Sequence, residues 1–88
     1  LEIYQQAGDS AFQGRVLDKI GLNYAEQGRY EESLKAYEQA LLSFKKGGIS
    51  GAIEGSTLRN IGSLYASKGE YSKALSYYNS SLVAHRAT

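Results

Sequence analysis

The sequence predicts an all-α fold built from two antiparallel helical hairpins, on three observations. The chain repeats itself at an offset of 41 residues (62 − 21), so that Gly21 falls on Gly62. The repeated apolar residues are spaced three and four apart, as on one side of a helix. Glycines interrupt this pattern in a chain that has 10 glycines and no proline, which is typical of helices separated by short turns.

The repeat is carried by residues that are identical in both copies. The first copy contributes Ala11, Gly14, Leu17, Ile20, Gly21, Tyr24, Ala25, Gly28, Tyr30, Leu34, Tyr37 and Leu41. Their counterparts are Ala52, Gly55, Leu58, Ile61, Gly62, Tyr65, Ala66, Gly69, Tyr71, Leu75, Tyr78 and Leu82. Average composition gives about two or three matches by chance over such a window, so the identities indicate an internal duplication.

Each copy opens with an apolar stripe of helical spacing, from Leu17 to Gly28 in the first copy and from Leu58 to Gly69 in the second. The stripes predict first helices over 10–27 and 51–68. Each ends at a glycine, where a left-handed residue stops a helix. Residues 1–8 are predicted to be the tail of a preceding helix.

A second apolar stripe follows each glycine stop and predicts second helices over 30–46 and 71–86. Glu31 and Glu32 in the first turn suit the positive end of the helix dipole, and Gly47 and Gly48 end the first of these helices. The chain is therefore predicted to be one repeat-array fragment over 1–88, with repeat 1 at 10–48 and repeat 2 at 51–88.

Two glycines, Gly21 and Gly62, lie inside predicted helices, where glycine costs about 1 kcal/mol relative to alanine. We expect close helix packing there, with Tyr24 or Tyr65, one turn away, filling the space. Packing also accounts for the six tyrosines at duplicated positions, whereas Tyr4 and Tyr77 remain unassigned.

Composition and charge narrow the function classes. Ten basic and nine acidic residues give a net charge of +1, which disfavours nucleic acid as a partner. No apolar run is long enough to span a membrane and no signal peptide is recognisable, so we expect no membrane partner and a cytoplasmic location. Because the chain has no Met and begins at Leu1, it is expected to be a fragment of a longer protein.

The inventory of reactive residues does not support an enzyme. The chain has no Cys and a single His, His85, too few for a metal site or a catalytic triad, and we interpret His85 as a surface or end-packing residue. The glycines at 47, 48, 51 and 55 lack the Lys-Ser/Thr of a phosphate loop. We expect no catalytic residue, no metal and no cofactor.

The duplicated string resembles the signature of the tetratricopeptide repeat family. It runs Leu17, Ile20, Gly21, Tyr24, Gly28, Tyr30, Ser33, Tyr37, Ala40 in one copy and Leu58, Ile61, Gly62, Tyr65, Gly69, Tyr71, Ala74, Tyr78, Ser81 in the other. Leu stands where the family often has Trp, and the closing Pro is replaced by Lys45 and Arg86. The 41-residue unit is similar to the long-unit branch found in kinesin light chains, Leu-Gly-Asn scaffolds and bacterial arrays. The resemblance implies hairpins stacked as a right-handed α-solenoid.

The resemblance also implies a protein-binding scaffold, in which the other face of each first helix lines a concave groove for a peptide or helix. The candidate groove residues are Arg15, Asp18, Lys19, Leu22 and Glu26, and Ser56, Arg59, Asn60, Ser63 and Ser67. Arg59 could bind a carboxylate and Asn60 a peptide amide. Asp18 and Leu22 replace the residues of the family's chaperone-tail clamp, so chaperone C-termini are not expected ligands. Ordinary solvated surface is the alternative for each residue.

A second hypothesis is an assembly module that self-associates through its terminal helices. Leu75, Tyr78, Leu82 and Val83 lie on the last helix, with no further helix in the sequence to cover them. An exposed apolar patch tends to find a neighbour, so a homo-oligomer through the terminal helices is the competing prediction.

Overall fold

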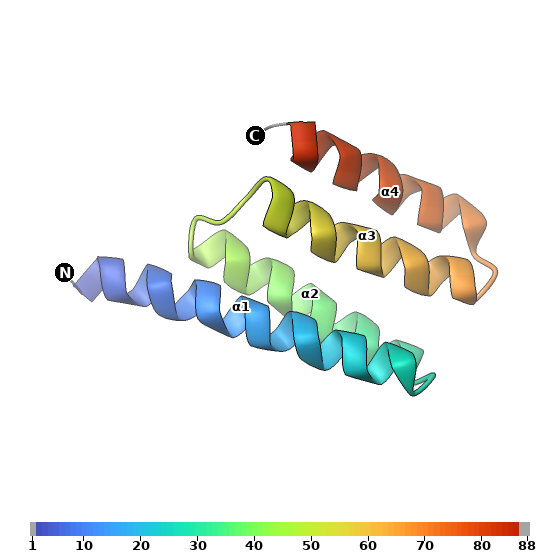
Figure 1. Ribbon diagram of the computed structural model, residues 1–88, viewed down its shortest axis with the longest axis horizontal. Helices are drawn as coiled ribbons and strands as arrows, with labels where there is room; N and C mark the ends of the chain where they lie inside the picture. Colours follow the sequence, from blue (N-terminus) through green and yellow to red (C-terminus); the bar gives the residue numbers. More distant parts are fainter. Residues whose placement is uncertain (1, 87–88) are drawn as a thin grey trace. The chain divides into compact units, whose positions relative to one another are not determined.

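Four helices joined by short turns make up the chain in the computed structural model, which describes residues 2–86 and the side chains of residues 8–86. The helices are α1 (Glu2–Glu26), α2 (Tyr30–Lys46), α3 (Ala52–Ser67) and α4 (Tyr71–Arg86). Helix α1 packs on α2 and α3 packs on α4, which gives two compact units, Leu1–Ile49 and Ser50–Thr88. The helices of each unit lie antiparallel (Figure 1). The predicted all-α hairpins are confirmed, and the described residues contain no strand.

The turn inside each hairpin is built on a left-handed glycine. Gly28 and Gly69 have φ values of +77° and +80°. The next backbone amide then reaches back to the last helical turn, where Arg29 N donates to Tyr24 O at 2.9 Å and Glu70 N donates to Tyr65 O at 2.8 Å. This is the hydrogen-bond pattern that satisfies carbonyls at a helix end. The predicted stops are therefore confirmed, and α2 and α4 occupy the predicted ranges.

Helix α1 is longer than expected. It runs without interruption from Glu2 through Gly8 and Asp9 to Glu26, so residues 2–8 continue the same helix instead of forming the tail of a separate one. Nothing lies within 4 Å of a Cβ placed on Gly8, and its φ is not positive. Gly8 therefore costs the helix only its propensity, about 1 kcal/mol, which a long helix tolerates.

The internal glycines mark the places where rings of the partner helix lie against the helix backbone. A Cβ on Gly21 would lie 2.7 Å from the ring of Tyr37, and one on Gly62 would lie 2.9 Å from the ring of Tyr78. The expected close packing is confirmed. The ring comes from the second helix, however, and not from Tyr24 or Tyr65. The space that a glycine opens lies between two backbones, so a side chain from the opposite helix fills it.

A second contact of this kind lies two turns nearer the start of each first helix. A Cβ on Gly14 would meet the ring of Phe44 at 2.6 Å, and one on Gly55 would meet the ring of His85 at 2.9 Å. His85 therefore occupies the packing position that Phe44 has in the first hairpin, in agreement with its interpretation as an end-packing residue.

A buried serine hydroxyl ties the two helices of each hairpin together. Ser33 Oγ donates to the carbonyl oxygen of Gly21 at 2.6 Å, and Ser81 Oγ donates to that of Gly55 at 2.7 Å. With no Cβ on the glycine, the second helix comes close enough for a short side chain to reach a main-chain oxygen. These bonds connect the packing of each hairpin to its glycines.

Candidate functional site

The five predicted binding residues of the first hairpin lie along one side of α1. They are Arg15, Asp18, Lys19, Leu22 and Glu26. At 3.6 residues per turn they fall within about a third of the helix circumference. All are exposed except Asp18, which is half-buried. This face presents two cations, two carboxylates and an apolar side chain, a mixture suited to a ligand with both polar and apolar groups.

The equivalent side of α3 carries Ser56, Arg59, Asn60, Ser63 and Ser67, within the same sector. Arg59, Ser63 and Ser67 are exposed, and Ser56 and Asn60 are half-buried. This face has one cation, three hydroxyls and one amide, and it lacks the carboxylates of the α1 face. The two faces therefore offer different chemistry to a ligand, although they stand at equivalent positions of the repeat.

Tyr78 adds a hydroxyl to the α3 face. Its ring lies against Gly62, and its hydroxyl lies 3.3 Å from Ser63 Oγ, where either atom can donate. The sequence predicted Tyr78 as a packing residue and as a candidate for self-association, and this polar contact was not predicted. A signal was present in the sequence, because tyrosine stands at both equivalent positions, 37 and 78, where phenylalanine would fill the same space without a hydroxyl.

The corresponding Tyr37 is almost completely buried, at 1% exposed. Burial raises the pKa of its phenol above the ordinary value, the negative charges of Asp18 and Glu26 raise it further, and a hydrogen bond with the Ser33 side chain acts in the opposite direction. Two carboxylates of the α1 face therefore act on the buried phenol. The neutral, protonated phenol is the form that this environment favours.

The four residues predicted for self-association do not form one patch. Leu75 and Leu82 are seven residues apart and lie on one side of α4, where both are exposed. Tyr78 lies over Gly62. Val83 lines a shallow hollow of about 680 Å³ together with Leu58 and Ala84, about a quarter turn from Leu82. Leu75 and Leu82 are therefore the pair from this set that shares one open side of α4, while Val83, which is also exposed, lies on another side.

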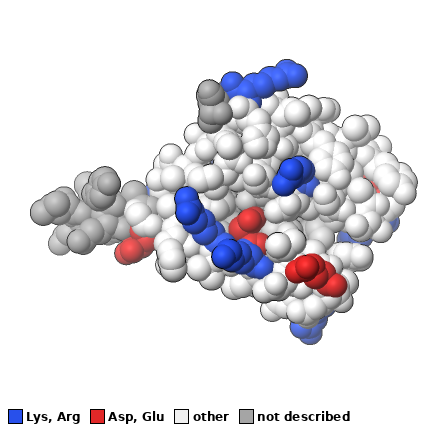
Figure 2. All heavy atoms as spheres, viewed as in Figure 1, with Lys and Arg blue, Asp and Glu red and all other residues white. Residues whose placement is uncertain are grey.

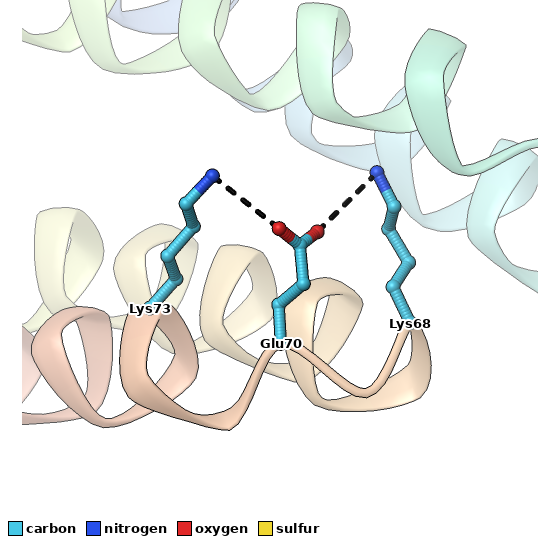
Figure 3. Close-up of polar contacts among 3 residues, drawn as sticks. All are labelled: Lys68, Glu70 and Lys73. Carbon is cyan, nitrogen blue, oxygen red and sulfur yellow. Dashed lines mark ion pairs between the residues drawn. The ribbon is translucent and has the colours of Figure 1, made fainter.

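The hairpin turns carry exposed ion pairs of opposite polarity. In the first turn Arg29 Nε lies 3.3 Å from Glu32 Oε1. In the second, Glu70 lies between two lysines, 3.3 Å from Lys73 Nζ and 3.7 Å from Lys68 Nζ (Figure 3). Exposed pairs of this kind contribute about 0.2–1 kcal/mol each. The pair in the first turn is neutral and the group in the second has one positive charge in excess, so neither turn offers a strongly charged site for a ligand.

Each turn also places a cation over a tyrosine. The guanidinium of Arg29 lies 5.5 Å from the ring centre of Tyr24, and Lys73 Nζ lies 5.4 Å from that of Tyr65. Tyr65 in addition stacks on Tyr77 with ring centres 5.5 Å apart, which assigns a packing role to Tyr77. Tyr4 lies outside the described side chains.

The face of the molecule drawn in Figure 2 has no strongly charged patch. Basic and acidic side chains are interspersed on the face drawn in Figure 2, and most of that face carries neither. Among the residues described, no three His, Cys, Asp or Glu side chains gather in a way that could hold a metal ion. None of the helices in this part of the chain is long and apolar enough to cross a membrane.

Comparison with known proteins gives one match. A family model described as "Tetratricopeptide repeat" matches residues 12–87. No curated protein and no solved structure matches the chain.

Proposed function

The chain belongs to the tetratricopeptide repeat family, whose members are generally protein–protein interaction scaffolds, and we propose that it binds a peptide or helix of another protein along the exposed faces of α1 and α3. The observation that supports this proposal is that the two hairpins share their packing residues but differ in the residues of these faces. The ring–glycine contacts recur in both hairpins, whereas every predicted binding residue of α1 differs from its counterpart in α3. Structure requires the shared residues, and the faces are free to differ with the ligand.

The chemistry of the faces supports recognition of a peptide. The Arg59 guanidinium can form two parallel hydrogen bonds with a carboxylate, and the Asn60 amide can both donate to and accept from a peptide bond. Leu22 is 48% exposed and offers an apolar contact. A groove shared by the two faces, and the long-unit type of repeat, belong to this proposal.

Alanine substitution at both Arg59 and Asn60 tests the assignment. Binders are first selected from a displayed peptide library with the wild-type chain, and the affinity of the best binder is then measured by calorimetry. We expect the double variant to bind at least about tenfold more weakly, because two polar contacts of about 1 kcal/mol each are lost. Alanine at Lys35 and Gln39, which are exposed on α2, is the matched control. Unchanged affinity at Arg59 and Asn60 would refute the assignment of the α3 face.

A specific observation favours self-association as a second function. Leu75 and Leu82 are 61% and 53% exposed, although their spacing is that of residues a helix normally buries. We propose that the chain associates with itself through this side of α4 at high concentration. A strict monomer in light scattering at millimolar concentration would rule this out and would leave the proposal for the α1 and α3 faces untouched.

A further inference from the structure

The tyrosines are the most readily oxidised side chains of this chain. Cys and Met, which are common targets of oxidants in proteins, are both absent, and so is Trp, whereas there are eight tyrosines. A one-electron oxidant removes an electron and a proton from a phenol and leaves a tyrosyl radical. The unpaired electron lies partly on the ring carbons next to the oxygen. The fate of such a radical therefore depends on what lies beside the ring.

Tyr65 of α3 and Tyr77 of α4 form a stacked pair inside the second hairpin. Their ring centres are 5.5 Å apart and their planes differ by 17°, which is the offset arrangement that aromatic pairs prefer. The ammonium groups of Lys73 and Lys68 lie 5.4 Å and 6.0 Å from the centre of the Tyr65 ring and help to fix its position. Two phenols from different helices of one compact unit are thus held against each other.

The repeat shows that packing alone does not require the second ring. Tyr65 corresponds to Tyr24 in the first hairpin, but the position of Tyr77 is held there by Ala36, which is 6% exposed. An alanine is therefore sufficient to close the same position of the fold. The pair of phenols is a property of the second hairpin and not of the repeated unit.

The burial of the two rings favours reaction with each other. Tyr65 and Tyr77 are both half-buried, so a small oxidant reaches their edges but neither ring is fully open to another molecule. Tyr71, in contrast, is 68% exposed at the start of α4. A radical on Tyr71 is the one that meets a second chain, whereas a radical on Tyr65 has Tyr77 next to it.

We propose that Tyr65 and Tyr77 are an oxidative cross-linking site, at which hydrogen peroxide and a haem catalyst join α3 to α4 through dityrosine. Each phenol loses one electron and one proton, and the two radicals form a carbon–carbon bond between ring carbons next to the oxygens. The hydrogens on those carbons are lost as protons while the two oxygens regain protons, which restores both phenols. One hydrogen peroxide takes up the two electrons and two protons and becomes two water molecules. The new bond prevents the two helices from separating.

The test is oxidation of the full chain at micromolar concentration with a soluble haem peptide and hydrogen peroxide. We expect a monomer that is lighter by two hydrogen atoms and has the blue fluorescence of dityrosine. After digestion with trypsin, the cross-link should join the peptides 60–68 and 74–86, which contain Tyr65 and Tyr77. Mass spectrometry measures the yield of this joined peptide.

Conservative variants identify the two partners. Tyr65→Phe and Tyr77→Phe keep the stacked rings but remove one phenol, and each should lower the yield of the joined peptide at least about tenfold, because no other phenol is positioned to react. Tyr78→Phe is the matched control. Tyr78 belongs to the same tryptic peptide as Tyr77, but its ring lies over Gly62, so the yield should equal that of the wild type.

Oxidation of the denatured chain tests whether the fold places the two rings together. In concentrated denaturant the yield of the joined peptide should fall, because the helices no longer hold the phenols side by side. An equal yield in denaturant overturns the proposal. So does a joined peptide that persists in Tyr77→Phe, or a wild type that gives linked dimers, abolished by Tyr71→Phe, in place of the cross-linked monomer.

Discussion

The two hairpins place serine and alanine at the same two positions in opposite order. Ser33 and Ala40 in α2 correspond to Ala74 and Ser81 in α4. Ser33 bonds the carbonyl of Gly21, and Ser81 bonds the carbonyl of Gly55, which is the other of the two glycine contacts. The comparison teaches that each hairpin retains a buried bond from a serine hydroxyl to a glycine carbonyl between its helices, and that either close contact can supply it.

The hairpins also differ in the ring that packs against the first of the two contact glycines, Gly14 in α1 and Gly55 in α3. Phe44 lies over Gly14 and is 1% exposed, whereas His85 lies over Gly55 and is exposed. The first hairpin therefore has an additional buried apolar ring. We expect it to be the more stable of the two.

Truncation of these rings should produce the largest difference. Phe44→Ala removes a fully buried ring and should lower the free energy of unfolding by about 3–5 kcal/mol. His85→Ala removes an exposed one and should cost about 1 kcal/mol or less. Denaturant unfolding followed by circular dichroism measures both. Equal losses at the two positions would contradict the claim that the first hairpin depends more on its end ring.

Substitution of alanine for two glycines of the same helix should produce opposite signs. Gly21→Ala pushes a Cβ into the ring of Tyr37, 2.7 Å away, and should destabilise by about 1–3 kcal/mol. Gly8→Ala meets nothing within 4 Å and should stabilise by about 0.5–1 kcal/mol through helix propensity. Thermal unfolding midpoints report the direction of each change. Stabilisation by Gly21→Ala would show that the ring contact is not tight.

Moving the serine of the first hairpin from position 33 to position 40 should test whether the two glycine contacts are interchangeable. Ser33→Ala removes the bond to Gly21 and should cost about 1 kcal/mol. Adding Ala40→Ser restores a hydroxyl at the position that Ser81 occupies in the second hairpin, and it should recover most of that loss. The comparison is made by denaturant unfolding of the two variants and the wild type. If Ala40→Ser deepens the loss, the two contacts are not interchangeable.

Alkaline pH should weaken the first hairpin through Tyr37. Burial, reinforced by Asp18, raises the pKa of Tyr37 above its ordinary 10.0. Above that value the unfolded chain releases the phenol proton while the folded chain keeps it. The stability that Tyr37 contributes is therefore complete below the unfolded pKa and is lost as pH rises through the folded pKa.

Tyr37→Phe should flatten this alkaline loss, whereas Tyr71→Phe, on an exposed ring, should leave it unchanged. Unfolding midpoints of the two variants and the wild type, measured from neutral to alkaline pH, provide the test. Parallel curves for Tyr37→Phe and the wild type would show that the buried phenol carries no linkage.

The sequence was sufficient to predict the hairpins and their turns. Helices α2 and α4 could be placed residue by residue, because a left-handed glycine stop and an apolar spacing each act locally. The start of α1 could not, because the duplicated pattern begins only at Ala11 and says nothing about the residues before it. The structure shows that residues 2–8 continue the same helix.

The candidate surfaces were predicted less well, and for a different reason. The residues of the α1 face and those of the α3 face follow from helical periodicity alone, so each set lies along one side of its own helix. The polar role of Tyr78 required knowledge of which ring crosses to Gly62. Leu82 and Val83 are neighbours in sequence but lie on different sides of α4. Phe12 has the apolar side chain of a core residue, and only the structure shows that it is exposed.

The glycine contacts and serine bonds described above lie within single hairpins, each joining a first helix to the second helix that directly follows it. A recombination event that deletes or duplicates one 41-residue hairpin therefore removes or adds both partners of each contact together. Gene lineages carrying this unit can consequently change the length of an array by whole hairpins while the packing inside every remaining hairpin stays intact.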